Sequence, residues 1–514
     1  MSKHLDTVYL SSRLTLAVAS GLLSFFAYPK PGLWPLIFVS VAGLLISVRG
    51  ATFARAAFVG FAGGFAFYAS QCWWLSQYLG PLPLVALSFI QALWVGLGLA
   101  IYALARRHTK SIFGSAILFA SLWMAREWAS THIPYGGYPW SRLAMSQSES
   151  PLAGWVYFGG FSLLSLVIAL LAALAVEWIP SFWAKRRDGL TSRRSFAVPA
   201  LVLLVAVLVP ALPPIANAKA QLDVAAIQGN ANAGLFANTR RGEILENHLD
   251  ATYELLRNEP SRKIDLIVWP ENASDLSPIV DVQARQWLSN LVNVDAKAPL
   301  TFGTITSNGS DLFNSSFLWE PGVGITDQYD KKRPVPFAEY VPDREFWNQL
   351  APDLIGLIYR DYAFGTRDAI YEVNGQKLGV LICFEVAIDE IFYELSDQGA
   401  TAILSQTNNA DFGRTDQAWQ QLAIAKLRSI ETGLALVNAS TVGPSAIYDR
   451  GGQLLDSSGA FERDYLVAQI GLTDSKTPAM IYGRYLDYFN LGLLGLALAW
   501  MLVRKLLERR NPRA

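Results

Sequence analysis

The chain has 514 residues, of which 52% are hydrophobic and only 16% are charged. A soluble protein normally has about a quarter charged residues, so the composition argues against a wholly soluble protein and excludes a disordered, coiled-coil or collagen-like chain. Residues 1–213 hold 15 Lys/Arg and 5 Asp/Glu, whereas residues 214–514 hold 27 and 37. Because the half with the more soluble composition is acidic, we expect no nucleic-acid partner.

The cysteine and histidine contents argue against a disulfide framework and a metal centre. Cys72 and Cys383 lie in unrelated contexts and are too few for a network of disulfides. The four histidines lie far apart and show no metal-ligand spacing. We therefore expect neither a metal nor another cofactor.

Seven apolar stretches follow one another in the first half of the chain, and one more lies near the end. A membrane-spanning helix needs about 20 mostly apolar residues. We interpret the first stretch as a retained anchor, because further spans follow it directly. The predicted spans are 11–28, 32–48, 54–76, 82–104, 111–129, 155–178, 195–213 and 487–503.

The short connections between these stretches alternate between basic and weakly charged. The basic connections fall at 49–55, 106–110 and 185–194, and the tail after 503 is also basic. Because basic loops stay on the cytoplasmic side, the N-terminus is predicted to be cytoplasmic and residues 214–486 extracytoplasmic. Residues 487–514 are predicted to form the eighth transmembrane helix and a basic cytoplasmic tail. We expect a multi-pass protein of the cytoplasmic (inner) membrane.

A transporter or channel is the alternative for a chain with so many spans. Such proteins place charged residues along the path of their substrate. The predicted spans are almost free of charge, with Arg126, Glu127 and Glu177 near their ends, and a large soluble insert precedes the last one. The spans therefore indicate a platform of seven helices over 1–213 that carries a domain.

Residues 214–486 alternate short β-rich runs with helical ones. The β-rich runs include 222–230, 264–274, 299–306, 377–388 and 400–412. Strands interleaved with helices predict an α/β or α+β domain with buried sheets.

Three segments of this domain could carry chemistry. Glu271 follows the apolar strand of DLIVWPENAS, Lys331 begins the basic run of YDKKRPVPFAEYVP, and Cys383 ends the strand of GVLICFEVAI. A thiol needs a base or a neighbouring cation to become a nucleophile, and a lysine can stabilise an oxyanion.

Each of these residues also has a structural interpretation. Free cysteine is usually a small buried hydrophobe, the basic run at Lys331 suits a solvated surface, and Glu271 suits the cap of a turn. Cys72, beside Trp73 and Trp74 at a span end, is interpreted as structural.

Taken in order, WPE, YDKKRPVPFAEYVP and LICFE resemble the Glu–Lys–Cys set of the nitrilase superfamily. A nitrilase-like domain between seven spans and an eighth resembles the apolipoprotein N-acyltransferase family, and GGYPW (136–140), QGN (228–230) and TNNADFG (407–413) extend the likeness. WPENASD and QGN resemble actinobacterial members. The resemblance implies an αββα sandwich for the domain beside a membrane α-helical bundle.

The resemblance also implies a reaction. Family members transfer an acyl chain from a membrane phospholipid to the α-amino group of the S-diacylglyceryl cysteine of an apolipoprotein. Cys383 would form a thioester with the acyl chain, Glu271 would act as the general base and acid, and Lys331 would stabilise the oxyanions.

Supporting roles follow from the same motifs. Glu339 would orient Lys331, Glu385 would flank the nucleophile, and the backbone N–H of Phe384 would donate to the oxyanion. Ala338 and Asp411 depart from the family, which often has Gly and Trp there. These departures concern how acyl chains or the second substrate are held.

Two other function classes stay open. One is a membrane-anchored amidase or nitrile hydrolase that uses the same three residues. The other is a non-catalytic scaffold that docks a glycosyltransferase; some actinobacterial relatives are associated with a polyprenyl-phosphate mannosyltransferase, which the resemblance offers as a partner.

Residues 346–359 form an apolar segment between the lysine and cysteine motifs. One interpretation places its side chains in the domain core. The other is a mobile lid, with Trp347, Leu354 and Ile358 in contact with substrate or lipid.

Overall fold

The computed structural model describes residues 2–109, 111–187, 194–211, 213, 217–234, 240–358 and 360–510. Parts of two predicted basic connections, at 110 and 188–193, and the end of the tail at 511–514 lie outside the described residues. The chain divides into two compact units. The first comprises Met1–Ser76, Gly80–Pro213 and Pro478–Ala514, and the second comprises Gln77–Leu79 and Pro214–Thr477.

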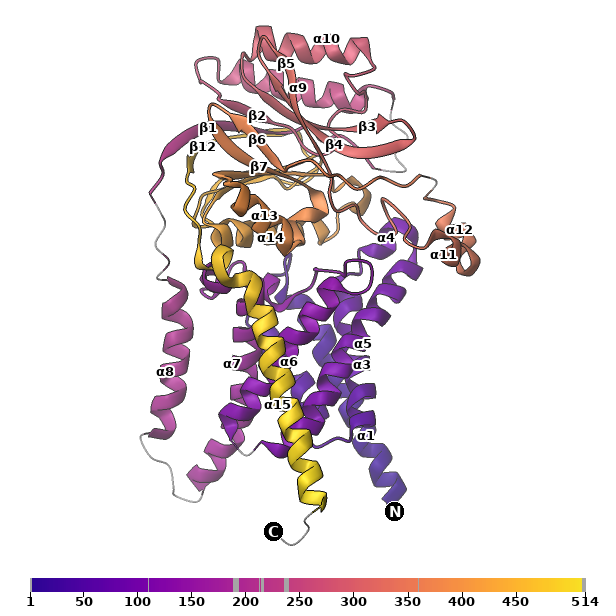
Figure 1. Cartoon of the computed structure of the whole chain (residues 1–514), viewed down its shortest axis with the longest axis vertical. Coiled ribbons are helices and arrows are strands. Elements are labelled where there is room, and N and C mark those ends of the chain that lie inside the picture. The colour runs from indigo at the N-terminus through magenta and orange to yellow at the C-terminus, as the bar shows by residue number, and fades with distance from the viewer. Residues whose placement is uncertain are drawn as a thin grey trace. The chain divides into compact units, whose positions relative to one another are not determined.

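The first unit is built from helices (Figure 1). A helix lies over each of the eight predicted spans. Their bounds are α1 Ser2–Leu23, α2 Leu36–Val48, α3 Phe53–Gln71, α5 Pro81–Ala105, α6 Ile112–His132, α7 Val156–Arg187, α8 Arg194–Leu208 and α15 Arg484–Arg510. The short α4, Leu75–Leu79, precedes α5.

Among the described residues, four helices are long and apolar enough to cross a membrane: Tyr9–Ala27, Pro81–His108, Ala153–Pro180 and Ala479–Val503. The last begins before the predicted residue 487, because helical structure starts at Ala479. Two more apolar helices, Leu36–Val48 and Ala197–Ala211, are shorter. The structure thus supports a helical region with four candidate spans.

The charged side chains predicted near span ends are buried in the first unit and paired. Glu177 on α7 is 2.9 Å from Arg106 and 3.1 Å from Arg49. Glu127 on α6 is 3.3 Å from Arg126 and 3.7 Å from Arg142. Pairing offsets the cost of removing these charges from water, so they join helices to one another and to the loop after α6.

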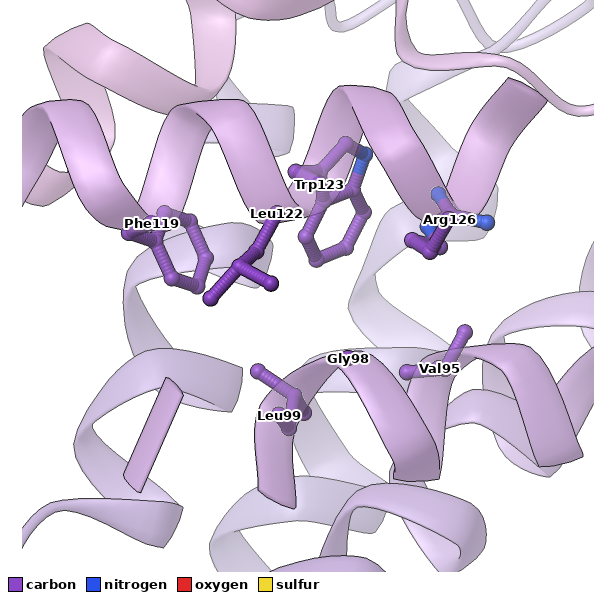
Figure 2. Close-up of a pocket in the computed structure, with 7 residues that line it drawn as sticks. All are labelled: Val95, Gly98, Leu99, Phe119, Leu122, Trp123 and Arg126. Carbon is purple, nitrogen blue, oxygen red and sulfur yellow. The ribbon is translucent and has the colours of Figure 1, made fainter. Parts of the chain in front are cut away.

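A small pocket lies between α5 and α6 (Figure 2). Its lining is apolar except for one arginine: Val95, Gly98, Leu99, Phe119, Leu122, Trp123 and Arg126. The Arg126 guanidinium stacks 4.3 Å from the Trp123 ring and donates to the Tyr68 hydroxyl at 2.7 Å. The pocket lining offers no nucleophile and no carboxylate for the predicted chemistry.

The second unit contains two six-stranded sheets. The first has the order β12-β1-β2-β3-β4-β5 and the second β11-β10-β9-β8-β7-β6. The strands of the first sheet are β1 Ala220–Gln228, β2 Leu266–Val268, β3 Leu300–Asn308, β4 Asp311–Glu320, β5 Gly324–Asp330 and β12 Asp464–Leu472. Those of the second are β6 Ile370–Val373, β7 Gln376–Ile382, β8 Ala402–Thr407, β9 Ala435–Ser440, β10 Ala446–Tyr448 and β11 Leu454–Ser457.

Helices cover both sides of this pair of sheets. Figure 1 shows α9 (Glu243–Asn258) and α10 (Val282–Asn290) on one side, with α13 (Asp389–Gln398) and α14 (Gln417–Thr432) on the other. The apolar face of α9 packs on the first sheet in a core that includes Trp269. This αββα arrangement confirms the predicted nitrilase-like fold of the domain.

Parallel pairing determines where the predicted site residues fall. β1, β2 and β3 are parallel neighbours in the first sheet, and β7, β8 and β9 are parallel neighbours in the second. All six residues of β8 and of β9 are buried, as expected for central strands covered on both faces. Glu271 and Cys383 follow the carboxyl ends of β2 and β7, where α/β sheets commonly bind ligands.

Candidate active site

Glu271 lies in a tight turn that follows β2. The turn approaches β3 so closely that a Cβ atom on Gly303 would lie 2.7 Å from the Cα of Glu271. Only glycine therefore fits at 303 without displacing the turn. The side chain of Glu271 is 4% exposed, and its Oε1 accepts a hydrogen bond from Asn314 Nδ2 at 2.7 Å. Among the described residues, Oε2 makes no hydrogen bond.

Lys331 directly follows β5 and is also buried. Its Nζ lies 3.4 Å from Glu271 Oε1 and 2.9 Å from Glu339 Oε2. The next lysine, Lys332, points elsewhere and pairs with Glu394. The structure therefore brings Lys331, rather than Lys332, to Glu271, and places the predicted Glu339 beside it.

Asn314 is a site residue that the sequence analysis missed. It lies on β4, and its Nδ2 donates to Glu271 Oε1 and to Glu339 Oε1 at 2.7 and 2.9 Å. Its backbone C=O accepts from the N–H of Lys331 at 2.8 Å. The available signal was an amide side chain in the middle of a strand, because such a group needs hydrogen-bond partners when the strand is buried.

Cys383 begins a short 3₁₀ turn, Cys383–Ala387, directly after β7. Its φ of 54° is in the left-handed region, which costs free energy for a residue other than glycine and often occurs at functional sites. The thiol is partly buried, and Gln421 Nε2 lies 3.8 Å from its Sγ. Burial and the negative charge of Glu271 raise the pKa of the thiol to about 12, although Lys331 opposes this shift.

The two carboxylates and the amine influence one another. Burial raises the pKa of Glu271 above its ordinary value; the charge of Lys331 opposes this and the charge of Glu339 reinforces it. Burial alone would lower the pKa of Lys331, but Glu339 and Glu271 outweigh it and raise that pKa. Lys331 is thus a permanent cation, and Glu271 is a carboxylate that takes up a proton more readily than usual.

Glu385 connects the lysine segment, residues 329–333, to the cysteine turn, Cys383–Ala387. Its Oε1 accepts from the backbone N–H groups of Lys332 and Arg333 at 2.8 and 3.1 Å, and its Oε2 accepts from that of Ile382 at 2.8 Å. The Tyr329 hydroxyl donates to the same carboxylate. Glu385 is fully buried, so it holds the residues beside Lys331 and Cys383 together.

Arg428 on α14 holds the backbone of the cysteine turn. The sequence analysis did not identify this residue either. Its Nε donates to the C=O of Val386 and its NH2 group to that of Ala387, each at 2.9 Å. Asp389 and Glu431 neutralise the fully buried guanidinium. Because the turn carbonyls are held by this rigid planar group, the strained backbone at Cys383 has fixed neighbours.

The remaining predicted residues are distributed more widely. Phe384 is the second residue of the cysteine turn. Trp347, in α11 (Arg344–Leu350), makes an edge-to-face contact with Phe337, and Leu354 is half-buried in α12 (Pro352–Ile355). Ile358 is buried in a small apolar cluster with Val341 and Ile355. Tyr359, the last residue of the predicted segment, lies outside the described residues.

Gln228 of the QGN motif has a structural role. Its Nε2 donates to the C=O groups of Gly459 and Glu462, and its Oε1 accepts from Ser445 and Ser458, all at 2.8–2.9 Å. With these four bonds the buried amide joins β1 to the loops around β10 and β11.

Comparisons with known proteins assign both parts of the chain. The model of the apolipoprotein N-acyltransferase N-terminal domain matches residues 20–174, and that of carbon-nitrogen hydrolase matches residues 223–477. The apolipoprotein N-acyltransferase of Azotobacter vinelandii is 31% identical over 524 residues, which cover 97% of this chain and 96% of that protein. The chain belongs to the apolipoprotein N-acyltransferase family.

A second relative from the family is the apolipoprotein N-acyltransferase of Mycolicibacterium smegmatis. It is 30% identical over 497 residues, which cover 91% of this chain and 82% of the relative. Among solved structures, an amidase from Nesterenkonia sp. matches with a TM-score of 0.38 and 16% identity over 52% of this chain and 96% of the amidase. The two curated relatives confirm, at the level of the family, the resemblance that the WPE, lysine and LICFE segments indicated.

Proposed function

We propose that the protein transfers an acyl chain from a membrane phospholipid to the α-amino group of the S-diacylglyceryl cysteine of apolipoproteins. The observation that carries the proposal is the convergence of Glu271, Lys331 and Cys383: Lys331 Nζ lies 3.4 Å from Glu271 Oε1, and both charges lie close enough to Cys383 to shift the pKa of its thiol. Membership of the family favours acyl transfer over the hydrolysis of a small amide.

The first half-reaction releases the lysophospholipid. Glu271 takes the proton of the Cys383 thiol while Sγ attacks the ester carbonyl, and the oxyanion is stabilised by Lys331 and the backbone N–H of Phe384. The C–O bond then breaks, and Glu271 returns the proton to the leaving alkoxide. Because the thiol has a raised pKa, an adjacent base is required for this step.

The second half-reaction transfers the acyl chain to the amine. The α-amino group attacks the thioester carbonyl, Glu271 removes a proton from the nitrogen, and the C–S bond breaks. The proton passes to the departing Cys383 thiolate, which restores the free enzyme. Lys331 keeps its charge through both halves because its pKa is raised.

A reconstituted system tests the activity. The full-length protein in vesicles is incubated with phospholipid and a synthetic diacylated lipopeptide. The expected result is a lipopeptide heavier by one acyl chain and a hydroxylamine-sensitive acyl group on Cys383. Release of ammonia from small amides without acyl transfer would instead support an amidase.

We also propose the topology that the basic connections predict. It has eight spans in the cytoplasmic membrane, with a platform at 1–213, an extracytoplasmic catalytic domain at 214–486 and a cytoplasmic tail after the helix that begins at 487 or earlier. Reporter fusions in the connections 106–110 and 185–194, expected inside, and within 240–260, expected outside, test it. An association with a polyprenyl-phosphate mannosyltransferase stays a prediction.

The segment 346–358 is proposed as a lid, and its two faces support this role. Ile355 and Ile358 form a small apolar cluster with Val341 of the preceding loop, packed against Phe337 and Trp347. Outside this cluster, Phe346, Leu350 and Leu357 are 55%, 64% and 44% exposed. A segment held by a small separate cluster moves more easily than one embedded in the domain core, and its exposed side chains suit contact with acyl chains.

A further inference from the structure

Two glutamines on α14 lie beside the nucleophile. Gln421 Nε2 is 3.8 Å from Cys383 Sγ, and Gln421 Oε1 accepts from Gln417 Nε2 at 3.2 Å. The two residues are one helical turn apart and so share a face of the helix. They are 1% and 3% exposed. Buried side-chain amides are uncommon and need hydrogen-bond partners, so the pair requires an explanation beyond filling the core.

In both hydrogen bonds of this pair the amide NH2 group donates, from Gln417 to Gln421 and from Gln421 to the sulfur of Cys383. An amide NH2 group only donates, so the sulfur is the acceptor in the contact with Gln421. Turning both amides round would present the oxygen of Gln421 to the sulfur, which would favour the neutral thiol over the thiolate. The orientation Gln417 to Gln421 to Cys383 is therefore the one that stabilises a sulfur anion.

The rest of α14 supports a positioning role for this helix. Seven residues beyond Gln421, Arg428 holds the carbonyls of Val386 and Ala387 in the cysteine turn. One helix thus contacts both the backbone that follows the nucleophile and the sulfur atom itself. A change in the position of α14 would move the turn and the sulfur together.

We propose that Gln421, fixed by Gln417, is a positioning residue that orients Cys383 Sγ and donates a hydrogen bond to its thiolate. The inference deepens the proposed function, because it rests on Cys383 being the nucleophile. When Glu271 takes the thiol proton, the sulfur gains a negative charge in a largely buried site. Lys331 supplies a charge nearby, and Gln421 supplies a direct donor.

The test measures the alkylation of Cys383 by iodoacetamide as a function of pH. Cys72→Ala in the full-length protein leaves Cys383 as the single thiol. Gln421→Met keeps the side-chain volume but removes the donor. Because a hydrogen bond to a charged group is worth about one pKa unit or more, we expect the alkylation rate at pH 7 to fall about tenfold and the profile to move to higher pH.

Three further variants separate positioning from stability. Gln421→His retains an N–H donor and should restore most of the rate. Gln417→Met removes only the anchor of Gln421 and should give a smaller shift in the same direction; it also serves if Gln421→Met fails to fold. Gln420→Met removes another buried amide from the same helix and should leave the profile unchanged.

The outcomes are distinct from those that test acyl transfer. A profile for Gln421→Met that matches the parent, or an equal shift in Gln420→Met, would overturn the positioning role. If the parent formed no acyl-enzyme from phospholipid but its alkylation still depended on Gln421, the proposed function would fail and this inference would stand. Normal acyl-enzyme formation without that dependence would support the proposed function and overturn this inference.

Discussion

The hydroxyl of Tyr329 donates to both carboxylate oxygens of Glu385, at 2.9 and 3.0 Å. Tyr329 lies two residues before Lys331, and Glu385 lies two residues after Cys383. The two oxygens are thus held between the lysine segment and the cysteine turn, which belong to different sheets. The distance between the oxyanion-stabilising cation and the nucleophile therefore depends on a carboxylate that does no chemistry itself.

Replacing Glu385 tests this dependence. Glu385→Ala removes the acceptor of three backbone N–H groups and should lower acyl transfer at least 100-fold, because the lysine segment and the cysteine turn lose their common anchor. Tyr329→Phe removes one donor and should cost about tenfold. Acyl-enzyme formation, followed by intact mass, is the measurement. Glu394→Ala, which removes the carboxylate that pairs with Lys332 and accepts from Gln398, is the control; an equal loss in that variant would contradict the role of Glu385.

The roles assigned to Cys383, Glu271 and Lys331 predict how strongly each substitution lowers the rate of acyl transfer. Cys383→Ala should abolish transfer with the fold preserved, and Glu271→Gln and Lys331→Met should each reduce the rate by two to four orders of magnitude. Single-turnover acyl transfer and thermal unfolding are measured for each variant. Lys332→Met should stay close to the parent. If it were the more damaging lysine change, or if the acyl group were trapped away from Cys383, the assignment would be wrong.

The three central residues of this site could be predicted because the WPE, lysine and LICFE segments occur in the order typical of the nitrilase superfamily. In the structure the three residues follow the ends of β2, β5 and β7, which belong to two different sheets. Asn314 and Gln421 escaped prediction because each lies inside a regular element, and only the pairing of β4 with β5 and the packing of α14 bring them to the site. Sequence periodicity identifies a buried face, but it does not identify what that face contacts.

In the membrane region the positions of the helices could be predicted, but the number of membrane spans could not be confirmed. Helices occur at all eight predicted stretches, yet only four of the described helices are both long and apolar enough to be candidate spans. Polar and charged residues in α3 and α6, such as Arg55 and Glu127, lower the mean hydropathy of these helices. Mean hydropathy scores each side chain as if it were transferred into lipid alone. It does not take into account that the charge of Glu127 is buried against Arg126 and Arg142.

Asn314 provides a prediction that sequence reasoning did not supply. Asn314→Leu removes one of the two donors that Oε1 of Glu271 and Oε1 of Glu339 share, the other being Lys331 Nζ, and should reduce acyl transfer 10- to 100-fold. Asn314→Asp adds a third carboxylate beside two others and should be more harmful. Thr306→Val, which changes the neighbouring strand without touching either carboxylate, is the control. Equal activity of Asn314→Leu and the parent would show that Lys331 alone orders the carboxylates.

The pH dependence of the reaction should follow the ionisation of Glu271. Glu271 must be ionised to take the thiol proton, and its pKa is raised by burial and by the charge of Glu339. Activity is therefore present above this raised pKa and is lost as the pH falls through it. Glu339→Gln removes one negative neighbour, so the pKa of Glu271 should fall and the acid limb of the rate profile should move to lower pH, even though the maximal rate also falls.

The profile is measured as single-turnover acyl-enzyme formation between pH 4 and 8, with folding checked at each pH. Glu394→Gln removes a carboxylate outside the site and should leave the acid limb in place. A shift of the limb to higher pH in Glu339→Gln would mean that Glu339 acts on Glu271 mainly by orienting Lys331 and not through its own charge.

The segment 346–358 predicts a separation between activity and stability. Its exposed residues, Phe346, Leu350 and Leu357, contribute little to the packing of the domain. Replacing all three with Ser should barely change the thermal unfolding of the domain. It should lower turnover several-fold on phospholipid in vesicles, because a lid that engages acyl chains loses about 25 cal/mol per Å² of apolar contact.

The matched control changes the inner face of the same segment. Ile355→Ala with Ile358→Ala disrupts the small cluster with Val341 and should loosen the whole segment, which increases its proteolysis and impairs turnover on every donor. A short-chain, water-soluble ester donor distinguishes the two sets, since it needs no lipid contact. The outer-face variant should use that donor as well as the parent does. An outer-face variant that lost activity equally on both donors would assign the segment to support of the active site and not to lipid contact.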